Sequence, residues 1–230
     1  MGSHKSSEQL KKERLQVMGQ ELGSIYHVLY NEVSWIHAKW LQYRQLYAKS
    51  PKRIELLNEV SGFFFRVVQD VFWENVLLHL ARLTDPPQSV GKANLTLLRL
   101  PPVIPESSLA EEVQNLVEVA VSESSFAREW RNRRLAHRDL ALALDDGAKP
   151  LPGVSRQNVE NSLAAFRDVL NQLSGHYLDT TISFEHFISY DDGEALVYYL
   201  RLAAHTDKLR RERLGEGSIS LKDLEPPPDG

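Results

Sequence analysis

The chain has 230 residues, and none of them is cysteine. The absence of cysteine excludes disulfide bonds, zinc sites with thiolate ligands and cysteine nucleophiles. The histidines are also not spaced as metal ligands, because no two of them share a helix face with an acidic third ligand. We therefore expect neither a metal site nor a cofactor.

Long apolar runs are missing as well. The first residues, MGSHKSSEQLKKER, contain no apolar stretch that could act as a signal peptide, and Met1–His4 has the character of an expression remnant. No later segment approaches the roughly 20 apolar residues that a membrane span requires. We expect a cytoplasmic protein without a membrane partner.

The chain also lacks an overall basic charge. Its formal net charge is −4, with 42% hydrophobic and 25% charged residues, which is ordinary for a globular protein. Proteins that coat nucleic acids without specificity are usually basic overall. Any polyanion binding by this chain must therefore be concentrated on a local patch.

Such a patch is present in the segment REWRNRRLAHRD, residues 128–139. Only Glu129 and Asp139 oppose its positive charge. Five arginines and one histidine crowd this short segment, and they are Arg128, Arg131, Arg133, Arg134, His137 and Arg138. This concentration of cationic groups predicts a local anion-binding site.

Two long amphipathic patterns predict helices in the first half of the chain. Apolar residues recur every three or four positions from Leu15 to Tyr47, which predicts one helix that Pro51 ends. A second stripe, from Leu57 to Arg82, is flanked by additional aromatic residues. We expect this second helix to be the most buried one and to end at residues 84–87.

The second half begins with a connection, residues 84–107, that contains five prolines. Ser108, with Glu111 three residues later, predicts a capping box at the start of the next helix, and Ser155 predicts the N-cap of another. Residues 178–190 alternate in polarity, which is typical of a short strand or an extended piece.

A last helix is expected from residue 194 to 214. Together these elements predict an all-α bundle of about four to six helices with a long proline-containing connection. We expect a single domain over residues 15–214, a flexible N-terminus over 1–14 and a flexible tail over 215–230.

Arg131, Asn132 and His137 contain the groups needed to cleave RNA without a metal. The reaction removes the proton of the 2′-hydroxyl, which attacks the neighbouring phosphorus and expels the 5′-oxygen. Histidine titrates near neutrality and can carry either proton, and a guanidinium can hold the phosphoryl oxygens as negative charge builds on them. Asn132 can orient the phosphate or the imidazole.

Helix geometry sets a condition on this hypothesis. On a straight α-helix, Arg131 and His137 lie about 120° apart around the axis and about 9 Å apart along it. Either the helix loosens near His137, or a second copy of the chain completes the site. Arg133 and Arg134 lie one turn before His137, so we expect them to lower the pKa of its imidazole.

Around this motif the sequence resembles the HEPN superfamily, in particular its AbiU-like abortive-infection branch. The family's motif of arginine, a polar residue, several further residues and histidine corresponds to RNRRLAH at residues 131–137. The segments VSWIHAKWLQYRQLY and ELLNEVSGFFFRVVQDVFWENVLLHLARLTDP are similar to the first two helices of that branch. The resemblance covers roughly residues 30–200.

The resemblance implies a HEPN-type helical bundle that is commonly a homodimer. Many members are metal-independent endoribonucleases in toxin–antitoxin or phage-defence systems, so RNA and an antitoxin protein are the implied partners. The implied catalytic residues are His137 as general acid or base, Arg131 for charge stabilisation and Asn132 for phosphate positioning. The remaining arginines either contact phosphate or form solvated surface, and they are Arg128, Arg133, Arg134 and Arg138.

Two other interpretations remain open. The chain is either a non-catalytic module of the same fold, which binds a nucleotide, RNA or a protein, or a scaffold whose charged groups pair with Glu129 and Asp139. Asn75, His79 and Arg82 are interpreted as buried polar groups that satisfy one another.

Overall fold

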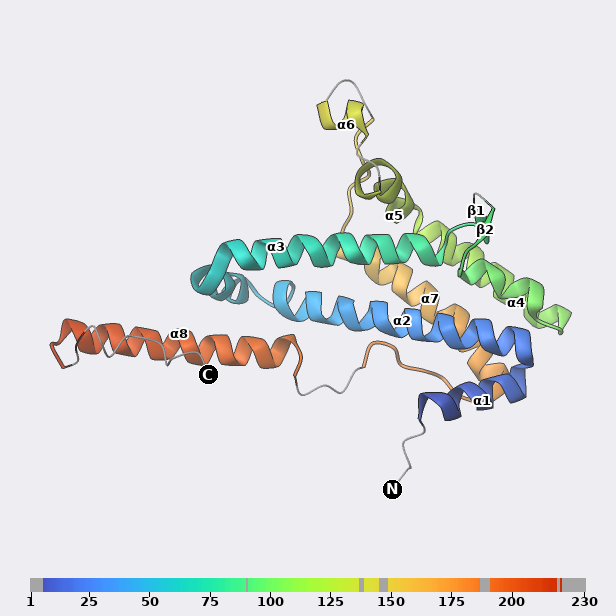
Figure 1. Ribbon diagram of the computed structural model, residues 1–230, viewed down its shortest axis with the longest axis horizontal. Helices are drawn as coiled ribbons and strands as arrows, with labels where there is room; N and C mark the ends of the chain where they lie inside the picture. The colour runs from blue at the N-terminus through green and yellow to red at the C-terminus, as the bar shows by residue number, and fades with distance from the viewer. Residues whose placement is uncertain are drawn as a thin grey trace. The chain divides into compact units, whose positions relative to one another are not determined.

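The computed structural model describes residues 6–89, 91–136, 139–144, 149–186, 191–218 and 220, and these form a predominantly helical protein (Figure 1). The helices are α1 (Ser7–Met18), α2 (Gln20–Tyr47), α3 (Pro51–Leu83), α4 (Ser107–Glu123), α5 (Ser125–Trp130), η3 (Arg131–Leu135), α6 (Leu140–Leu144), α7 (Arg156–Leu178) and α8 (Gly193–Gly215). The expected all-α class is confirmed.

The proline-containing connection after α3 contains only short elements. Strands β1 (Gln88–Ser89) and β2 (Lys92–Ala93) pair antiparallel, and two short 3₁₀ turns follow, η1 (Leu97–Arg99) and η2 (Pro101–Val103). The predicted end of α3 at residues 84–87 and the long connection behind it are both confirmed.

The chain divides into two compact units. The first comprises Met1–Lys39 and Trp73–Phe187, and the second comprises Trp40–Phe72 and Ile188–Gly230. Both α2 and α3 contribute a segment to each unit.

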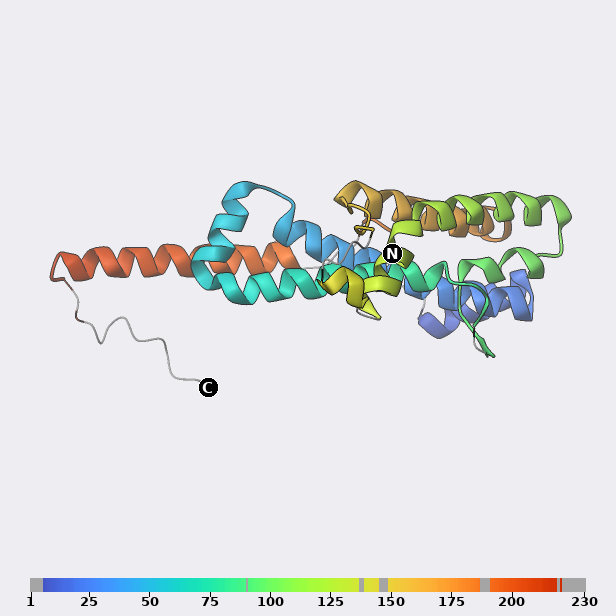
Figure 2. The same cartoon turned by 90° about the horizontal axis from the view of Figure 1, so that it is seen from above.

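The core of the first unit is built from the apolar faces of α2, α3, α4 and α7. Helices α4 and α7 lie side by side in both views (Figures 1 and 2). Side chains from all four helices are completely or almost completely buried, among them Leu22, Tyr26, Leu29, Leu77, Leu80, Val113, Val117, Phe166 and Leu170. At about 1.5–3 kcal/mol for each large apolar side chain, this burial is the main stabilising contribution.

The second unit has a small apolar cluster of Leu46, Leu57, Phe65 and Val197. A polar network at the start of α8 supplements it. Arg53 makes two hydrogen bonds of 2.9 Å to the carboxylate of Glu194. The side chain of Asp192 accepts hydrogen bonds from the first backbone N–H groups of α8, as an N-cap residue does.

Several sequence expectations are corrected at helix starts. The predicted helix from residue 15 to 47 is two helices, because Gly19 adopts a φ of 80°, which ends α1 before α2 begins. The capping box of Ser108 and Glu111 is wrong, since α4 begins at Ser107 and its N-cap residue makes no side-chain capping bond. The N-cap at Ser155 is confirmed, and Asn158 completes a capping box with it.

The predicted strand at 178–190 is also wrong for the residues that the structure describes there, 178–186, none of which is in a strand. Asn171 on α7 holds this segment instead, since its amide donates to the Ile182 carbonyl and accepts from the Ile182 N–H. Residues 187–190 lie outside the described residues.

Helix α3 is not the most buried helix. Ser61 interrupts its helical backbone with φ −164° and ψ 73°. On both sides of that kink apolar side chains are exposed to solvent, with Val60 at 40% before it and Phe63 at 85%, Phe64 at 58%, Val67 at 44% and Val71 at 61% exposure after it. An apolar periodicity shows that a helix has an apolar face, but it does not show whether the same chain covers that face.

Two buried histidines of the first unit make its stability depend on pH. Burial lowers the pKa of His37 to about 4, and burial together with the nearby charges of Lys39 and Arg82 lowers the pKa of His79 to about 4. Because the unfolded chain binds these protons near pH 6.5, stability decreases as the pH falls from about 6.5 to 4. We expect a loss of about 1–2 kcal/mol per histidine at pH 5 in urea unfolding.

The variant His79→Gln should show a smaller loss of unfolding free energy between pH 7 and pH 5 than the native chain. His205 is exposed on α8, so His205→Gln serves as the control and should keep the native pH slope. An unchanged slope in His79→Gln would contradict this account.

Candidate functional site

The motif segment lies where α5 passes into η3, and η3 is π-helical rather than α-helical. The N–H of Ala136 donates to the carbonyl of Arg131, five residues earlier, at 2.8 Å. Short π-helical insertions are rare and occur frequently at functional sites. The helix therefore loosens directly before His137, which is one of the two conditions set by the straight-helix geometry.

His137 and Arg138 lie outside the described residues. Their roles, and the expected lowering of the pKa of His137, stay predictions. The described residues on either side are Ala136 and Asp139, and the N–H of Asp139 donates to the carbonyl of Arg133 at 3.0 Å.

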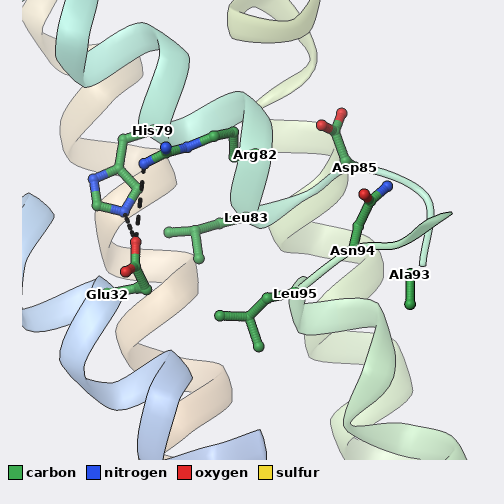
Figure 3. Close-up of a pocket in the computed structure, with 8 residues that line it drawn as sticks. All are labelled: Glu32, His79, Arg82, Leu83, Asp85, Ala93, Asn94 and Leu95. Atoms are coloured by element: carbon green, nitrogen blue, oxygen red, sulfur yellow. Dashed lines mark ion pairs between the residues drawn. The ribbon is translucent and has the colours of Figure 1, made fainter. Parts of the chain in front are cut away.

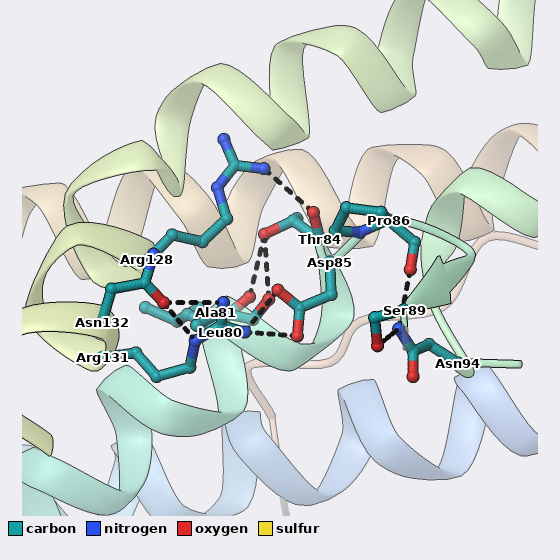
Figure 4. A network of polar contacts seen from close by, with 10 residues as sticks. All are labelled: Leu80, Ala81, Thr84, Asp85, Pro86, Ser89, Asn94, Arg128, Arg131 and Asn132. Atoms are coloured by element: carbon teal, nitrogen blue, oxygen red, sulfur yellow. Dashed lines mark hydrogen bonds and ion pairs between the residues drawn. The ribbon is translucent and has the colours of Figure 1, made fainter. Parts of the chain in front are cut away.

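The guanidinium of Arg131 is held by two protein acceptors (Figure 4). Its Nη1 donates to both carboxylate oxygens of Asp85, directly after the end of α3. Its Nε and Nη2 donate to Oδ1 of Asn132 at 3.0 and 2.9 Å. The Arg131 and Asp85 side chains are only 24% and 17% exposed, so water screens this ion pair poorly.

Arg128 lies one turn before Arg131 and also contacts the C-terminal end of α3. Its Nη1 donates to the carbonyl of Thr84 at 2.9 Å, and its Nη2 donates to the carbonyl of Val121 at 3.1 Å. Thr84 directly follows α3 and Val121 lies in the last turn of α4. The carbonyls of a last helical turn lack intrahelical partners, and a cation at a helix C-terminus is favoured by the helix dipole. In the described structure Arg128 thus connects α3, α4 and α5, and its phosphate-binding role stays a prediction.

Arg133 is the arginine that pairs with the nearby acids. It lies 3.5 Å from Glu129 and 3.4 Å from Asp139, and it donates to the carbonyl of Lys149 at 2.7 Å. Hydrogen bonds from the Leu142 N–H and from Arg133 hold the pKa of Asp139 below its usual range. Arg133 is therefore partly neutralised, whereas Arg131 pairs elsewhere.

Arg134 lies over the ring of Trp130, with its guanidinium carbon 5.3 Å from the ring centroid. The indole N–H of Trp130 donates to the carbonyl of Pro152 at 2.9 Å. The ring is thus fixed and positions a cation at the surface beside the motif.

Asn75, His79 and Arg82 do not satisfy one another as expected. Nε2 of His79 lies 2.8 Å from the carboxylate of Glu32 on α2, and Nη2 of Arg82 lies 3.9 Å from it (Figure 3). Asn75 accepts a hydrogen bond of 2.9 Å from Lys39, also on α2. The partners on α2 were missed because each lies more than 35 positions away in the sequence.

Asp85 was also missed as a site residue. In the sequence it reads as part of a helix stop, TDPP, and the stop does occur there. Its pairing with Arg131 spans 46 positions, so no local pattern reports it. The one available signal was its place in the LARLTDP segment, which resembles the family.

Among the described residues, no cluster of histidine, aspartate and glutamate has the geometry to hold a metal ion. No helix in the described part of the chain is long and apolar enough to cross a membrane.

The ion pair between Arg131 and Asp85 predicts a specific loss of stability. Asp85→Asn removes the negative charge beside a half-buried guanidinium, so we expect the free energy of unfolding to fall by about 1–3 kcal/mol. Asp70→Asn is the matched control, because Asp70 pairs with Arg66 at 3.3 Å with both side chains more than half exposed. An exposed pair contributes less than about 1 kcal/mol, and equal losses in the two variants would contradict the assignment.

Comparison with known proteins indicates the family of this chain. No curated protein and no solved structure matches the chain. A protein-family model described as AbiU2, of the HEPN type, matches residues 19–196, which include α2 to α5, η3 and α7. The match extends over more than half of the chain and contains both the end of α3 and the motif segment that pairs with it. The chain therefore belongs to the HEPN AbiU2 family.

Proposed function

We propose that the chain is a metal-independent endoribonuclease of the HEPN type that acts in phage defence or as a toxin. Membership of the family supports a nuclease-like or abortive-infection module. The endoribonuclease activity is proposed from the placement of Arg131. Its guanidinium is fixed by Asp85 and Asn132 at a π-helical turn directly before His137.

In the proposed reaction His137 removes the proton of the 2′-hydroxyl or returns a proton to the leaving 5′-oxygen. The 2′-oxygen forms a bond to phosphorus as the bond to the 5′-oxygen breaks, which leaves a 2′,3′-cyclic phosphate. Negative charge builds on the phosphoryl oxygens during this displacement, and Arg131 stabilises it. No metal is required at any step.

The hydrogen bonds of Arg131 support a role for Asn132 in this reaction. Oδ1 of Asn132 accepts from Nε and Nη2, the edge with which arginine binds phosphate oxygens in a bidentate manner. Rotation of the Asn132 amide frees that edge for the substrate, while Asp85 continues to hold Nη1. In this proposal Asn132 occupies the phosphate position until RNA arrives and then orients the phosphate.

The surrounding arginines supply a further cationic surface for the RNA backbone. Arg134 lies beside Trp130 and pairs with no acid among the residues that the structure describes, so it is the strongest candidate. The role of Arg128, Arg133 and Arg138 in phosphate binding is proposed on charge alone.

A homodimer is part of the proposal. The exposed residues Phe64, Val67 and Val71 lie on α3 after the kink at Ser61, and they are spaced by three and four positions, the spacing of a helix–helix seam. A second copy covers this apolar stripe when the same stripe of each chain meets across a twofold axis. An antitoxin protein is the other proposed partner, because the proposed function includes action as a toxin.

A non-catalytic HEPN module that binds RNA or a nucleotide is the second candidate. It is favoured by the same hydrogen bonds, because the guanidinium of Arg131 is already engaged by Asp85 and Asn132 and a purely structural arginine has such partners. The two candidates differ in whether RNA is cut.

The test of the nuclease is incubation of the protein with structured RNA in EDTA. We expect cleavage that leaves 2′,3′-cyclic phosphate ends, and a loss of at least about 100-fold in His137→Ala and in Arg131→Ala. The control is Arg156→Ala, since Arg156 is an exposed residue in the first turn of α7. RNA binding without His137-dependent cleavage would establish the binding module, and equal cleavage by all variants would reveal a contaminant.

The test of the dimer is light scattering coupled to size exclusion. We expect the native chain to have the mass of two copies and Phe64→Glu to have the mass of one, because a buried carboxylate opposite an apolar seam is unfavourable. Val119→Glu is the control, since Val119 is 51% exposed on α4, outside the stripe. A native monomer, or a Phe64→Glu dimer, would refute the proposed interface.

A further inference from the structure

A cavity of about 330 Å³ adjoins the proposed site (Figure 3). Asp85 belongs to both, because it lines the cavity and also accepts the hydrogen bonds of Arg131. The volume is within the range of small-molecule sites, roughly 300–1,000 Å³. The cavity therefore has room for one small ligand beside the arginine that is proposed to hold the scissile phosphate.

The walls of the cavity are apolar on one side. Leu83 at the end of α3, together with Ala93 and Leu95 of the connection, supplies these surfaces. Leu83 is 2% exposed and Leu95 is 38% exposed, so the wall continues from the core to the rim. Flat aromatic ligands such as nucleobases bind between surfaces of this kind.

The polar groups of the cavity are mainly hydrogen-bond acceptors. Asn94 has committed its amide nitrogen, which donates to the carbonyl of Pro86 at 2.8 Å and to the hydroxyl of Ser89 at 2.9 Å. Its Oδ1 accepts no hydrogen bond from the described part of the chain and faces away from those partners (Figure 4). The carboxylate of Glu32 is 40% exposed and adds two further acceptor atoms.

His79 and Arg82 lie beside the Glu32 carboxylate and hold it in place. His79 is 1% exposed and burial lowers its pKa to about 4, so His79 is neutral at pH 7 and adds no positive charge beside the carboxylate. Arg82 is 61% exposed and 3.9 Å from the carboxylate, a loose pairing that leaves its guanidinium able to contact a ligand. Guanidinium planes stack on unpaired bases and also bind phosphate.

We propose that this cavity binds one base of the RNA next to the scissile phosphate and prefers a base with an amino donor edge, guanine above all. Guanine presents its N1–H and N2–H groups side by side, which matches the two oxygens of one carboxylate. Uracil presents two carbonyl oxygens to the same acceptors and is disfavoured. The inference rests on the proposed function, because Arg131 is what relates the cavity to an RNA phosphate.

Direct binding tests the cavity without relying on cleavage. The 3′- and 5′-monophosphates of guanosine, adenosine, cytidine and uridine are titrated into the full chain by calorimetry. We expect the guanosine ligand to bind at least about tenfold more tightly than the uridine ligand, the effect of one well-formed bidentate pair. Equal affinities for the four bases would overturn the proposal.

Glu32→Gln sharpens the test, because it replaces one acceptor with a donor at nearly constant size. An amide matches the acceptor and donor of adenine, so we expect the preference to shift from guanosine to adenosine. Glu118→Gln is the matched control, since Glu118 is exposed on α4 and accepts a hydrogen bond from Gln114 on the same helix. A guanosine preference that survives in Glu32→Gln would refute the assignment of that carboxylate.

A second variant addresses the case in which Glu32→Gln fails to fold. Leu95→Trp fills the cavity from its exposed rim and should weaken all the monophosphates, with an unchanged far-ultraviolet circular dichroism spectrum. Unweakened binding in this folded variant would show that the ligand sits elsewhere.

The outcomes separate this proposal from the nuclease itself. Guanosine binding that depends on Glu32, without any RNA cleavage, would leave the cavity assigned and the nuclease refuted. Cleavage without base preference at the cut sites, and without monophosphate binding, would leave the nuclease and refute the cavity.

Discussion

The structure of the site depends on how α3 ends. Pro86 and Pro87 stop that helix, and the carbonyl of Thr84 and the carboxylate of Asp85 are left directly behind its last turn. Arg128 on α5 and Arg131 at the start of η3 lie one turn apart. Arg128 binds the Thr84 carbonyl, and Arg131 binds the Asp85 carboxylate. The end of one helix thus fixes the orientation of another through hydrogen bonds and an ion pair.

This arrangement places two demands on Arg131. A guanidinium that stabilises a transition state must be held still, because preorganised charge is what makes such a group effective. It must also offer at least one edge to the substrate. Asp85 and Asn132 divide these tasks, since the ion pair holds Nη1 while a neutral amide, which is easier to displace than a carboxylate, occupies the Nε and Nη2 edge.

The long helices and the boundaries set by prolines could be predicted from the sequence, because apolar periodicity and backbone restriction are local properties. The break at Gly19 could not be predicted in this way, since the apolar pattern continues across Gly19 although the helical backbone is interrupted there. The exposure of Phe63 and Phe64 could not be predicted either, because a periodic pattern does not show which surface covers the apolar face of a helix. At the site, Arg131 and Asn132 were recognised from their residue types, whereas Asp85 and Glu32 became visible only when distant segments were brought together.

The π-helical turn changes the geometry of the motif segment. In a regular helix the step of six residues from Arg131 to His137 holds the two side chains on different faces, whatever their chemistry. A bond from the Ala136 N–H to the Arg131 carbonyl adds one residue to that turn, so the angular relation of every later residue to Arg131 changes. The same carbonyl belongs to the residue that Asp85 anchors through its side chain. Arg131 is therefore both the residue whose carbonyl closes the π-helical turn and a residue whose side chain fixes this helix to the end of α3.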